Sequence, residues 1–167
     1  CGFYEEAIKV LDVCRQDKPL ICYYKGYYYE CIGSHAQSLQ EYQKAEKCSP
    51  LYCFPNKLED IAVLKAAIAS NAEGAKAYYY LGNLYYDKLN FDTAIRLWEK
   101  SEALDNTYPT VLRNLAIAYY NKQGDEKKAK EKLERAFTLD QTDARVFLEL
   151  DQLYKKTGVK VEDRLQK

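Results

Sequence analysis

The 167-residue chain has no methionine, one histidine, one tryptophan and four prolines. It also has no net charge, because 25 Lys and Arg residues balance 25 Asp and Glu residues. Nucleic-acid-binding domains and proteins attracted to anionic lipids usually carry a surplus of positive charge. The balance therefore argues against nucleic acid and membrane surfaces as partners. Few prolines and many apolar residues also exclude a disordered chain.

Long apolar runs are missing as well. No stretch of about 18 consecutive apolar residues occurs, so the sequence predicts no membrane-spanning helix. The chain begins with Cys1 and enters an amphipathic stretch at once, which indicates a piece of a longer protein. The high content of Lys and Glu is typical of a cytoplasmic protein, and we expect that location.

The cysteine pattern argues against a metal centre. Structural zinc sites need four clustered Cys or His ligands, but the chain has no C-x-x-C pair and only His35 as a further ligand. An even number of cysteines leaves disulfides open, whereas the composition favours free and mostly buried thiols. Cys53 lies in a turn-like segment and is the candidate for a reactive thiol. The six are Cys1, Cys14, Cys22, Cys31, Cys48 and Cys53.

Catalytic motifs are absent from the sequence. There is no Gly-rich phosphate loop, no H-E-x-x-H and no G-x-S-x-G, and His35 has no partner at a recognisable motif spacing. We interpret His35 as a packing or capping residue. We expect no enzymatic activity, no cofactor and no metal.

What the sequence does contain is an internal repeat of about 34 residues. Between residues 75 and 108 the order is Tyr78-x-x-Leu81-Gly82-x-x-Tyr85, followed by Ala94-x-x-x-Trp98. The pattern returns as Leu112-x-x-Leu115-Ala116-x-x-Tyr119 with Ala129-x-x-x-Leu133 and one extra residue near Gly124. It occurs twice more, as Cys22-x-x-Lys25-Gly26-x-x-Tyr29 with Ser38-x-x-x-Tyr42, and as Phe147-x-x-Leu150-Asp151-x-x-Tyr154.

This order resembles the tetratricopeptide repeat, which pairs two antiparallel helices in each unit. The resemblance implies an all-α fold, a right-handed superhelical solenoid in which neighbouring units bury each other's apolar faces. The segment 52–56, followed by 77–84, is also similar to the C-terminal repeat region of large, mostly bacterial proteins with a β-rich N-terminal domain of unknown function.

The repeats divide the chain into six predicted segments. Residues 1–18 are the second helix of a truncated repeat, and residues 19–52 form one repeat. Residues 53–74 form a half-repeat with a single helix, expected over Asn56 to Ser70, which we interpret as the second helix of its unit. Residues 75–108 and 109–143 are complete repeats, and 144–167 are a truncated one.

In this family the first helices of the repeats line a concave groove, which implies a surface for a protein or peptide partner. Tyr, Arg and Asn are typical of such interaction surfaces. The opposing interpretation is that the 17 tyrosines reflect only coding composition. The predicted partner-binding residues are Tyr23, Tyr27, Lys76, Tyr79, Asn83, Tyr86, Arg113, Asn114, Ile117, Tyr120, Arg145, Leu148 and Gln152, with Asp87 and Asn121 beside them.

Some members of the family hold a peptide's C-terminal carboxylate in a clamp of Lys and Asn residues. The matching positions here are Tyr79, Asn83, Asn114, Arg145 and Glu149. A tyrosine and a glutamate replace basic residues, and Glu149 would repel a carboxylate. We therefore expect the groove to bind a segment without using such a clamp.

The predicted function is a scaffold for protein–protein interaction. The alternative is a non-catalytic helical arm that packs on the N-terminal domain of a larger, possibly carbohydrate-handling enzyme. Apolar helix faces at the two truncated ends also favour self-association.

Overall fold

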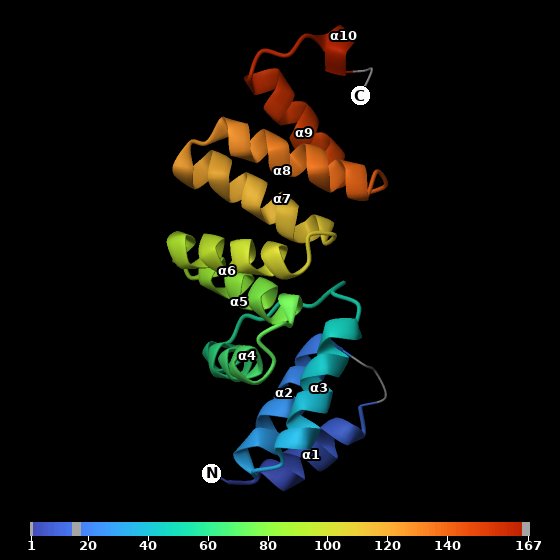
Figure 1. The fold of residues 1–167 in the computed structure, drawn as a ribbon, viewed down its shortest axis with the longest axis vertical. Coiled ribbons are helices and arrows are strands. Elements are labelled where there is room, and N and C mark those ends of the chain that lie inside the picture. Colours follow the sequence, from blue (N-terminus) through green and yellow to red (C-terminus); the bar gives the residue numbers. More distant parts are fainter. Residues whose placement is uncertain (1, 15–17, 165–167) are drawn as a thin grey trace. The chain divides into compact units, whose positions relative to one another are not determined.

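The computed structural model describes residues 2–14 and 18–164, where every regular element is a helix (Figure 1). This confirms the predicted all-α fold. Cys1, residues 15–17 and residues 165–167, which the predicted first and last segments include, lie outside the described residues. In chain order the helices are α1 (Tyr4–Asp12), α2 (Pro19–Cys31), α3 (His35–Lys47), α4 (Leu58–Ser70), α5 (Ala75–Asp87), α6 (Phe91–Leu104), α7 (Pro109–Ala118), η1 (Tyr119–Gln123), α8 (Glu126–Leu139), α9 (Ala144–Lys156) and α10 (Val161–Arg164).

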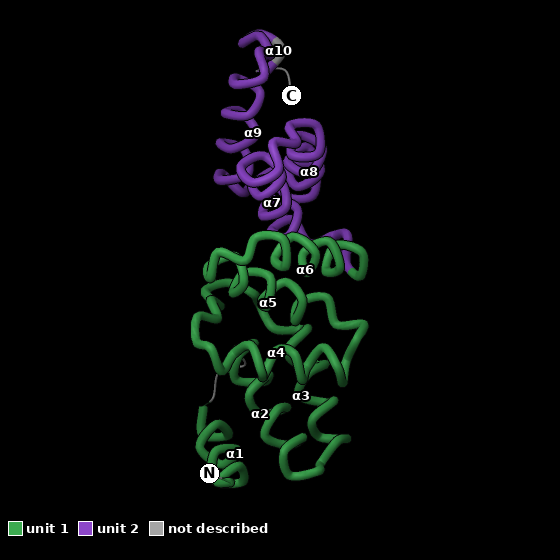
Figure 2. The backbone as a smooth tube through the Cα atoms, turned by 90° about the vertical axis from the view of Figure 1, so that its left-hand side faces the viewer, with its two compact units in different colours: residues 1–104 green, residues 105–167 purple. Residues whose placement is uncertain are grey.

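The chain divides into two compact units, Cys1–Leu104 and Asp105–Lys167 (Figure 2). In the first unit, α2 with α3 and α5 with α6 form antiparallel pairs, and α1 packs on α2. The single helix α4 contacts α5 and α2 more extensively than α3. In the second unit, α7 pairs with α8, and α9 packs against α8.

Glycine permits close helix crossing in the two pairs of the first unit. A Cβ atom on Gly82 would lie 2.5 Å from Cδ1 of Trp98, and a Cβ atom on Gly26 would collide with the ring of Tyr42. Only glycine leaves room for such rings at the helix surface. The indole of Trp98 is also fixed by hydrogen bonds, because Nε1 donates to Oδ1 of Asn83 at 3.1 Å.

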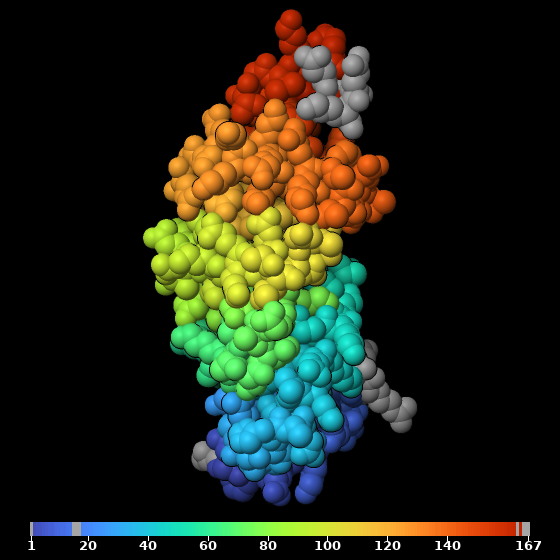
Figure 3. Space-filling view, viewed as in Figure 1, coloured from blue at the N-terminus to red at the C-terminus, as the bar shows by residue number. Residues whose placement is uncertain are grey.

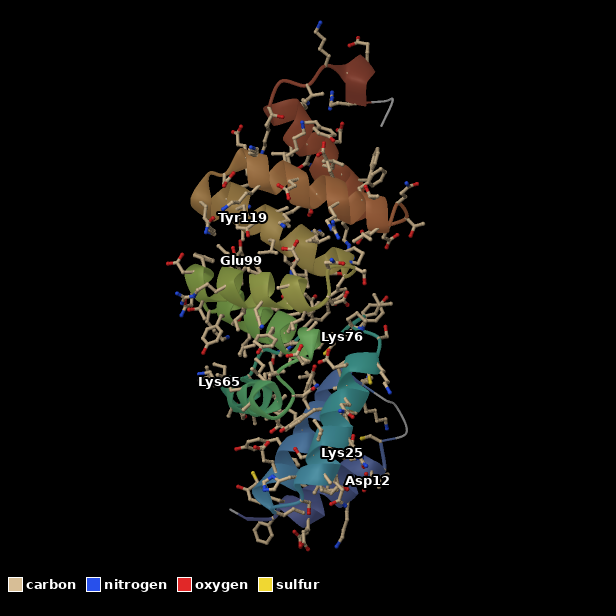
Figure 4. The ribbon with its side chains drawn as sticks, viewed as in Figure 1. Asp12, Lys25, Lys65, Lys76, Glu99 and Tyr119 are labelled. Atoms are coloured by element: carbon tan, nitrogen blue, oxygen red, sulfur yellow. The ribbon has the colours of Figure 1, made fainter. Side chains whose placement is uncertain are left out.

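An ion-pair cluster ties the first three helices together. Nζ of Lys25 on α2 lies 2.8 Å from Oδ1 of Asp12 and 2.8 Å from Oε1 of Glu41. Figure 4 shows Lys25 and Asp12 side by side at the α1 end of this unit. The Lys25 side chain is only 13% exposed, so its charge is partly desolvated and the two carboxylates compensate for that cost.

The cysteines differ from the predictions at two positions. Cys14 is exposed because α1 ends at Asp12, in contrast to the expectation that the thiols are mostly buried. Cys53, the candidate reactive thiol, is buried, and burial raises the pKa of its thiol. Cys22 and Cys48 are buried as free thiols, as predicted, with their sulfur atoms 4.0 Å apart.

Two further predictions change in detail. The helix expected over Asn56–Ser70 begins at Leu58, because Oδ2 of Asp60 accepts the backbone N–H groups of Asn56 and Lys57 and so fixes the residues before the helix. His35, predicted to be a packing or capping residue, is exposed as the first residue of α3, where Ser34 holds the N-cap position, so that prediction is wrong. Of the residues the structure describes, none belongs to a helix long and apolar enough to span a membrane.

Candidate functional site

The second unit contains an open pocket of about 110 Å³ between α7, η1, α8 and α9. Its lining combines apolar side chains from all three longer helices with polar groups from η1 and α9. We call it the α7–α9 pocket, and its lining residues are Ala116, Ile117, Tyr120, Asn121, Ala129, Leu133, Glu149, Gln152, Leu153 and Lys156.

Local sequence determines where the helices around this pocket begin. Pro109 starts α7, a position at which its missing N–H costs no hydrogen bond. Asp125 caps α8 by accepting the backbone N–H of Lys128 at 2.9 Å, and Asp143 caps α9 by accepting that of Arg145 at 2.9 Å. Hydrogen bonds from the Arg145 side chain and burial act on Asp143 in opposite directions, and the pKa of its carboxyl is lowered.

The end of α7 widens into one turn of π-helix, η1, which holds the extra residue noticed in the sequence near Gly124. Gly124 closes the turn at φ +66°, a left-handed conformation that glycine adopts without strain. The backbone N–H of Asp125 then donates to the carbonyl of Tyr119 at 3.0 Å. Tyr119 itself is buried at this end of α7, where Figure 4 labels it. The wider turn carries Tyr120 and Asn121, which line the pocket.

Two charged contacts involve helices α7 and η1 on one side and α9 on the other. Nη2 of Arg113 on α7 donates to Oε1 of Glu149 on α9. Nζ of Lys156 on α9 lies 5.0 Å from the ring centroid of Tyr120, a cation–π distance. The Arg113 and Glu149 side chains are 20% and 24% exposed, so this ion pair is only partly screened by water.

Three of the predicted partner-binding residues line this pocket, and Asn121 lines it with them. They are Ile117, Tyr120 and Gln152. Arg113 and Asn114 are half-buried on α7, whereas Arg145 and Leu148 are exposed on α9. The sequence did not reveal Lys156, because its role depends on the ring of Tyr120.

Other predicted partner-binding residues belong to the first unit, where their side chains contact neighbouring residues of the chain itself. The Lys76 ammonium donates to the carbonyl of Cys48 at 2.8 Å, and Figure 4 labels this residue at the start of α5. Asn83 accepts from Trp98, and the Tyr86 ring lies 5.2 Å from the indole of Trp98. Tyr27 on α2 is half-buried against Tyr28, with ring centroids 6.0 Å apart.

Two predicted residues are wrong as groove residues, because both side chains are buried. Tyr23 is completely buried between α3 and α5: its ring lies 5.9 Å from Tyr80, and its hydroxyl donates to Oε1 of Glu46 at 2.8 Å. Tyr79 is 6% exposed, and its ring packs at a tilt against that of Tyr80 with ring centroids 5.1 Å apart. Neither side chain has surface left for a partner.

Helix α8, shown in orange in Figure 3, carries many acidic and basic side chains. Lys130 pairs with Glu134 at 4.0 Å, and both side chains also contact Tyr154 of α9. The Tyr154 hydroxyl donates to Oε1 of Glu134 at 2.6 Å, and Nζ of Lys130 lies 5.3 Å from the ring centroid. These contacts join α8 to α9, and half-exposed ion pairs of this kind contribute little to stability by themselves. Among the described residues, no three His, Cys, Asp or Glu side chains cluster to hold a metal.

Comparison with known proteins agrees with this architecture. Residues 82–123 match the family model described as TPR repeat. Two crystal structures of MamA are similar to the chain: one at TM-score 0.56 with 19% identity, covering 99% of this chain and 84% of MamA, and one at 0.56 with 20% identity, covering 89% and 86%.

A third structure is the first TPR of Spaghetti (RPAP3), bound to the HSP90 peptide SRMEEVD. It is similar at TM-score 0.53 with 16% identity, covering 84% of this chain and 93% of that one. These likenesses, together with the helix pairs of each unit, show that the chain has the all-α fold of tetratricopeptide-repeat structures.

Proposed function

We propose that this chain is a protein-interaction scaffold that binds a peptide segment of a partner at the α7–α9 pocket, without catalysis of its own. The observation that carries the proposal is the pocket itself, which is open and lined by apolar side chains together with Tyr120, Asn121, Gln152 and Lys156. Binding sites commonly combine apolar walls with a few polar groups that fix orientation. The peptide bound by the RPAP3 structure supports the same kind of ligand for this fold.

The proposed ligand is an internal segment and not a free C-terminus. Of the positions that match a carboxylate clamp, Tyr79 is buried, Asn83 accepts from Trp98, and Glu149 is an acid paired with Arg113. Convergent donors for a terminal carboxylate would be needed, and these three side chains do not supply them. The remaining two predicted clamp residues are Asn114, half-buried on α7, and Arg145, exposed on α9, and we propose that both contact the segment outside the pocket.

A peptide selection tests this function. A random peptide library is selected on the full chain, and the selected peptides are measured by calorimetry against the wild type and the double variant Tyr120→Ala, Gln152→Ala. We expect the double variant to lose at least about tenfold in affinity, because it removes the aromatic and polar edge of the pocket. The matched control is Glu131→Ala on the exposed face of α8, which should bind as the wild type does.

The chemistry of the peptide terminus gives a second readout. The same selected peptide is prepared with a free and with an amidated C-terminus, and both should bind with equal affinity. A strong preference for the free acid would show a carboxylate site and contradict the internal-segment proposal. Failure to select any peptide, or equal binding by the double variant, would contradict the proposed function at this pocket and favour a helical arm covered by another part of its parent protein.

A further inference from the structure

The α7–α9 pocket lies where the other two helix pairs carry an aromatic ring. In α2 with α3 and in α5 with α6, a glycine faces the ring of Tyr42 or Trp98, and in both pairs the ring occupies the crossing. The corresponding residues of α7 and α8 are Ala116 and Leu133, at a separation longer by the one residue that η1 accommodates. Both line the pocket. The hollow therefore results from the replacement of a ring by the smaller side chain of leucine.

The size and lining of this hollow define what can enter it. Its volume is about 110 Å³, and the buried side chains of Ala129, Leu133 and Leu153 form part of its lining. An apolar cavity of roughly 150 Å³ is known to hold a benzene molecule and to stay dry otherwise. The hollow here is smaller, and its aliphatic lining suits one branched aliphatic side chain. Burying such a side chain is the main gain that the pocket offers.

Glu149 adds a polar requirement to the wall of the pocket. Its Oε1 accepts from Nη2 of Arg113, whereas its Oε2 is buried and, like the buried Nε of Arg113, has no hydrogen-bond partner among the described residues. A buried acceptor without a donor is costly, so a ligand that supplies an N–H group is favoured. Because Arg113 already balances the charge of Glu149 and Lys156 lies at the rim, a neutral donor suits this position better than a second cation.

We propose that the α7–α9 pocket takes one branched aliphatic side chain, Leu, Ile or Val, from an extended peptide segment, and that a main-chain N–H beside that side chain donates to Oε2 of Glu149. This inference rests on the proposed function and names the ligand class for the same site. Such a site differs from one for acidic peptides, because Glu149 offers a hydrogen-bond acceptor and would repel a carboxylate.

The test uses small probes and the full chain. N-acetyl-leucine-N′-methylamide is titrated into the ¹⁵N-labelled protein, and its dissociation constant, expected on the order of 1 mM for a ligand of this size, is read from amide shifts. The alanine analogue should bind at least about tenfold more weakly, since it lacks most of the apolar side chain. Analogues methylated at one or the other amide nitrogen should show a loss of about fivefold for the nitrogen that donates to Glu149.

Leu133→Phe is the matched protein variant, because it restores an aromatic ring at the position of Tyr42 and Trp98. A folded Leu133→Phe protein should no longer bind the leucine probe, whereas the Glu131→Ala protein, altered on the same helix, should bind it as the wild type does. If Leu133→Phe does not fold, the comparison of leucine with alanine and with phenylalanine probes on the wild type decides. A phenylalanine probe that binds as well as leucine, or an alanine probe of equal affinity, overturns the inference.

Different results would contradict the ligand class and the proposed function. If selected peptides bind at the pocket edge but carry no common aliphatic residue and tolerate Leu133→Phe, the ligand class is wrong and the proposed function stands. If neither the peptides nor the probes bind the chain, the proposed function fails, and this inference fails with it.

Discussion

Cα of Gly82 lies so close to the indole of Trp98 that a Cβ atom there would be 2.5 Å from both Cδ1 and Nε1 of the ring. The ring cannot move away freely, because Nε1 donates to the carbonyl of Tyr79 and to the side chain of Asn83. This contact lets α5 and α6 approach closely. It also reverses the effect on stability that a change from glycine to alanine usually has in a helix.

Gly82→Ala should destabilise the protein by about 1–3 kcal/mol, because the added methyl group overpacks the helix crossing. In an ordinary helix interior the same change stabilises a protein by roughly 0.5–1 kcal/mol. A loss of stability would therefore be specific to this contact. Urea unfolding followed by circular dichroism measures the difference, with Lys100→Ala on the exposed face of α6 as the control. An increase in stability would show that the two helices can separate without cost.

Trp98 should be among the most sensitive positions of the first unit. It is 3% exposed, and Trp98→Ala leaves a large cavity that should cost about 3–5 kcal/mol in the free energy of unfolding. Trp98→Phe keeps part of the ring and loses the Nε1 donor, so its cost should be smaller. Thermal unfolding of both variants gives the order, and equal losses would contradict a cavity as the main cause.

The thiols should fall into two classes when the native protein is alkylated. Cys14 and Cys31 are exposed and should be modified quickly, whereas Cys22, Cys48 and Cys53 are buried and should react only after unfolding. Burial and the neighbouring thiol of Cys48 also raise the pKa of Cys22 to about 12, which leaves little thiolate at neutral pH. Peptide mapping by mass spectrometry assigns each site. Rapid native modification of Cys53 would contradict its burial.

Stability should decrease in alkaline solution. Burial and a hydrogen bond to a carboxylate raise the pKa of Tyr23 and of Tyr24 above the ordinary value, with Glu46 and Asp60 as the acceptors. Above about pH 10, tyrosines of the unfolded chain lose protons that the folded chain still holds, so the free energy of unfolding falls as pH rises. Below that pH this contribution does not change.

Urea unfolding between about pH 8 and about pH 11 measures this decrease. Tyr23→Phe should make the decrease shallower, because the group that retains the proton is gone. Tyr52→Phe alters a ring that is 92% exposed and should leave the wild-type pH dependence in place. A stability that stays constant over the whole range would contradict the buried hydroxyl of Tyr23.

The sequence predicted the helices well because residues such as Leu81, Gly82 and Trp98 recur at fixed spacing. It assigned the adjacent tyrosines less well: Tyr79 and Tyr80 are equally bulky, and helical spacing alone does not say that both are buried. Tyr23 was also misplaced, since its burial depends on Tyr80 of a distant helix. The division into repeats stays a prediction.

The pocket could be predicted only in part. Ile117, Tyr120 and Gln152 follow from the phase of the first helices, and the extra residue near Gly124 pointed to an irregular turn. The hollow itself depends on Leu133 standing where two other pairs place a ring. The sequence does not show that the rings of Trp98 and Tyr42 fill the corresponding space against Gly82 and Gly26 in the other two helix pairs.

Binding of a partner peptide at the α7–α9 pocket is tested most directly by mapping amide shifts of the full ¹⁵N-labelled chain with a selected peptide. We expect the largest shifts on residues 116–121 and 149–156, which include most of the pocket lining, and no change on α4 in the first unit. Largest shifts on α4, or on the exposed residues Leu51, Tyr52 and Phe54, would contradict the claim that the partner enters the α7–α9 pocket.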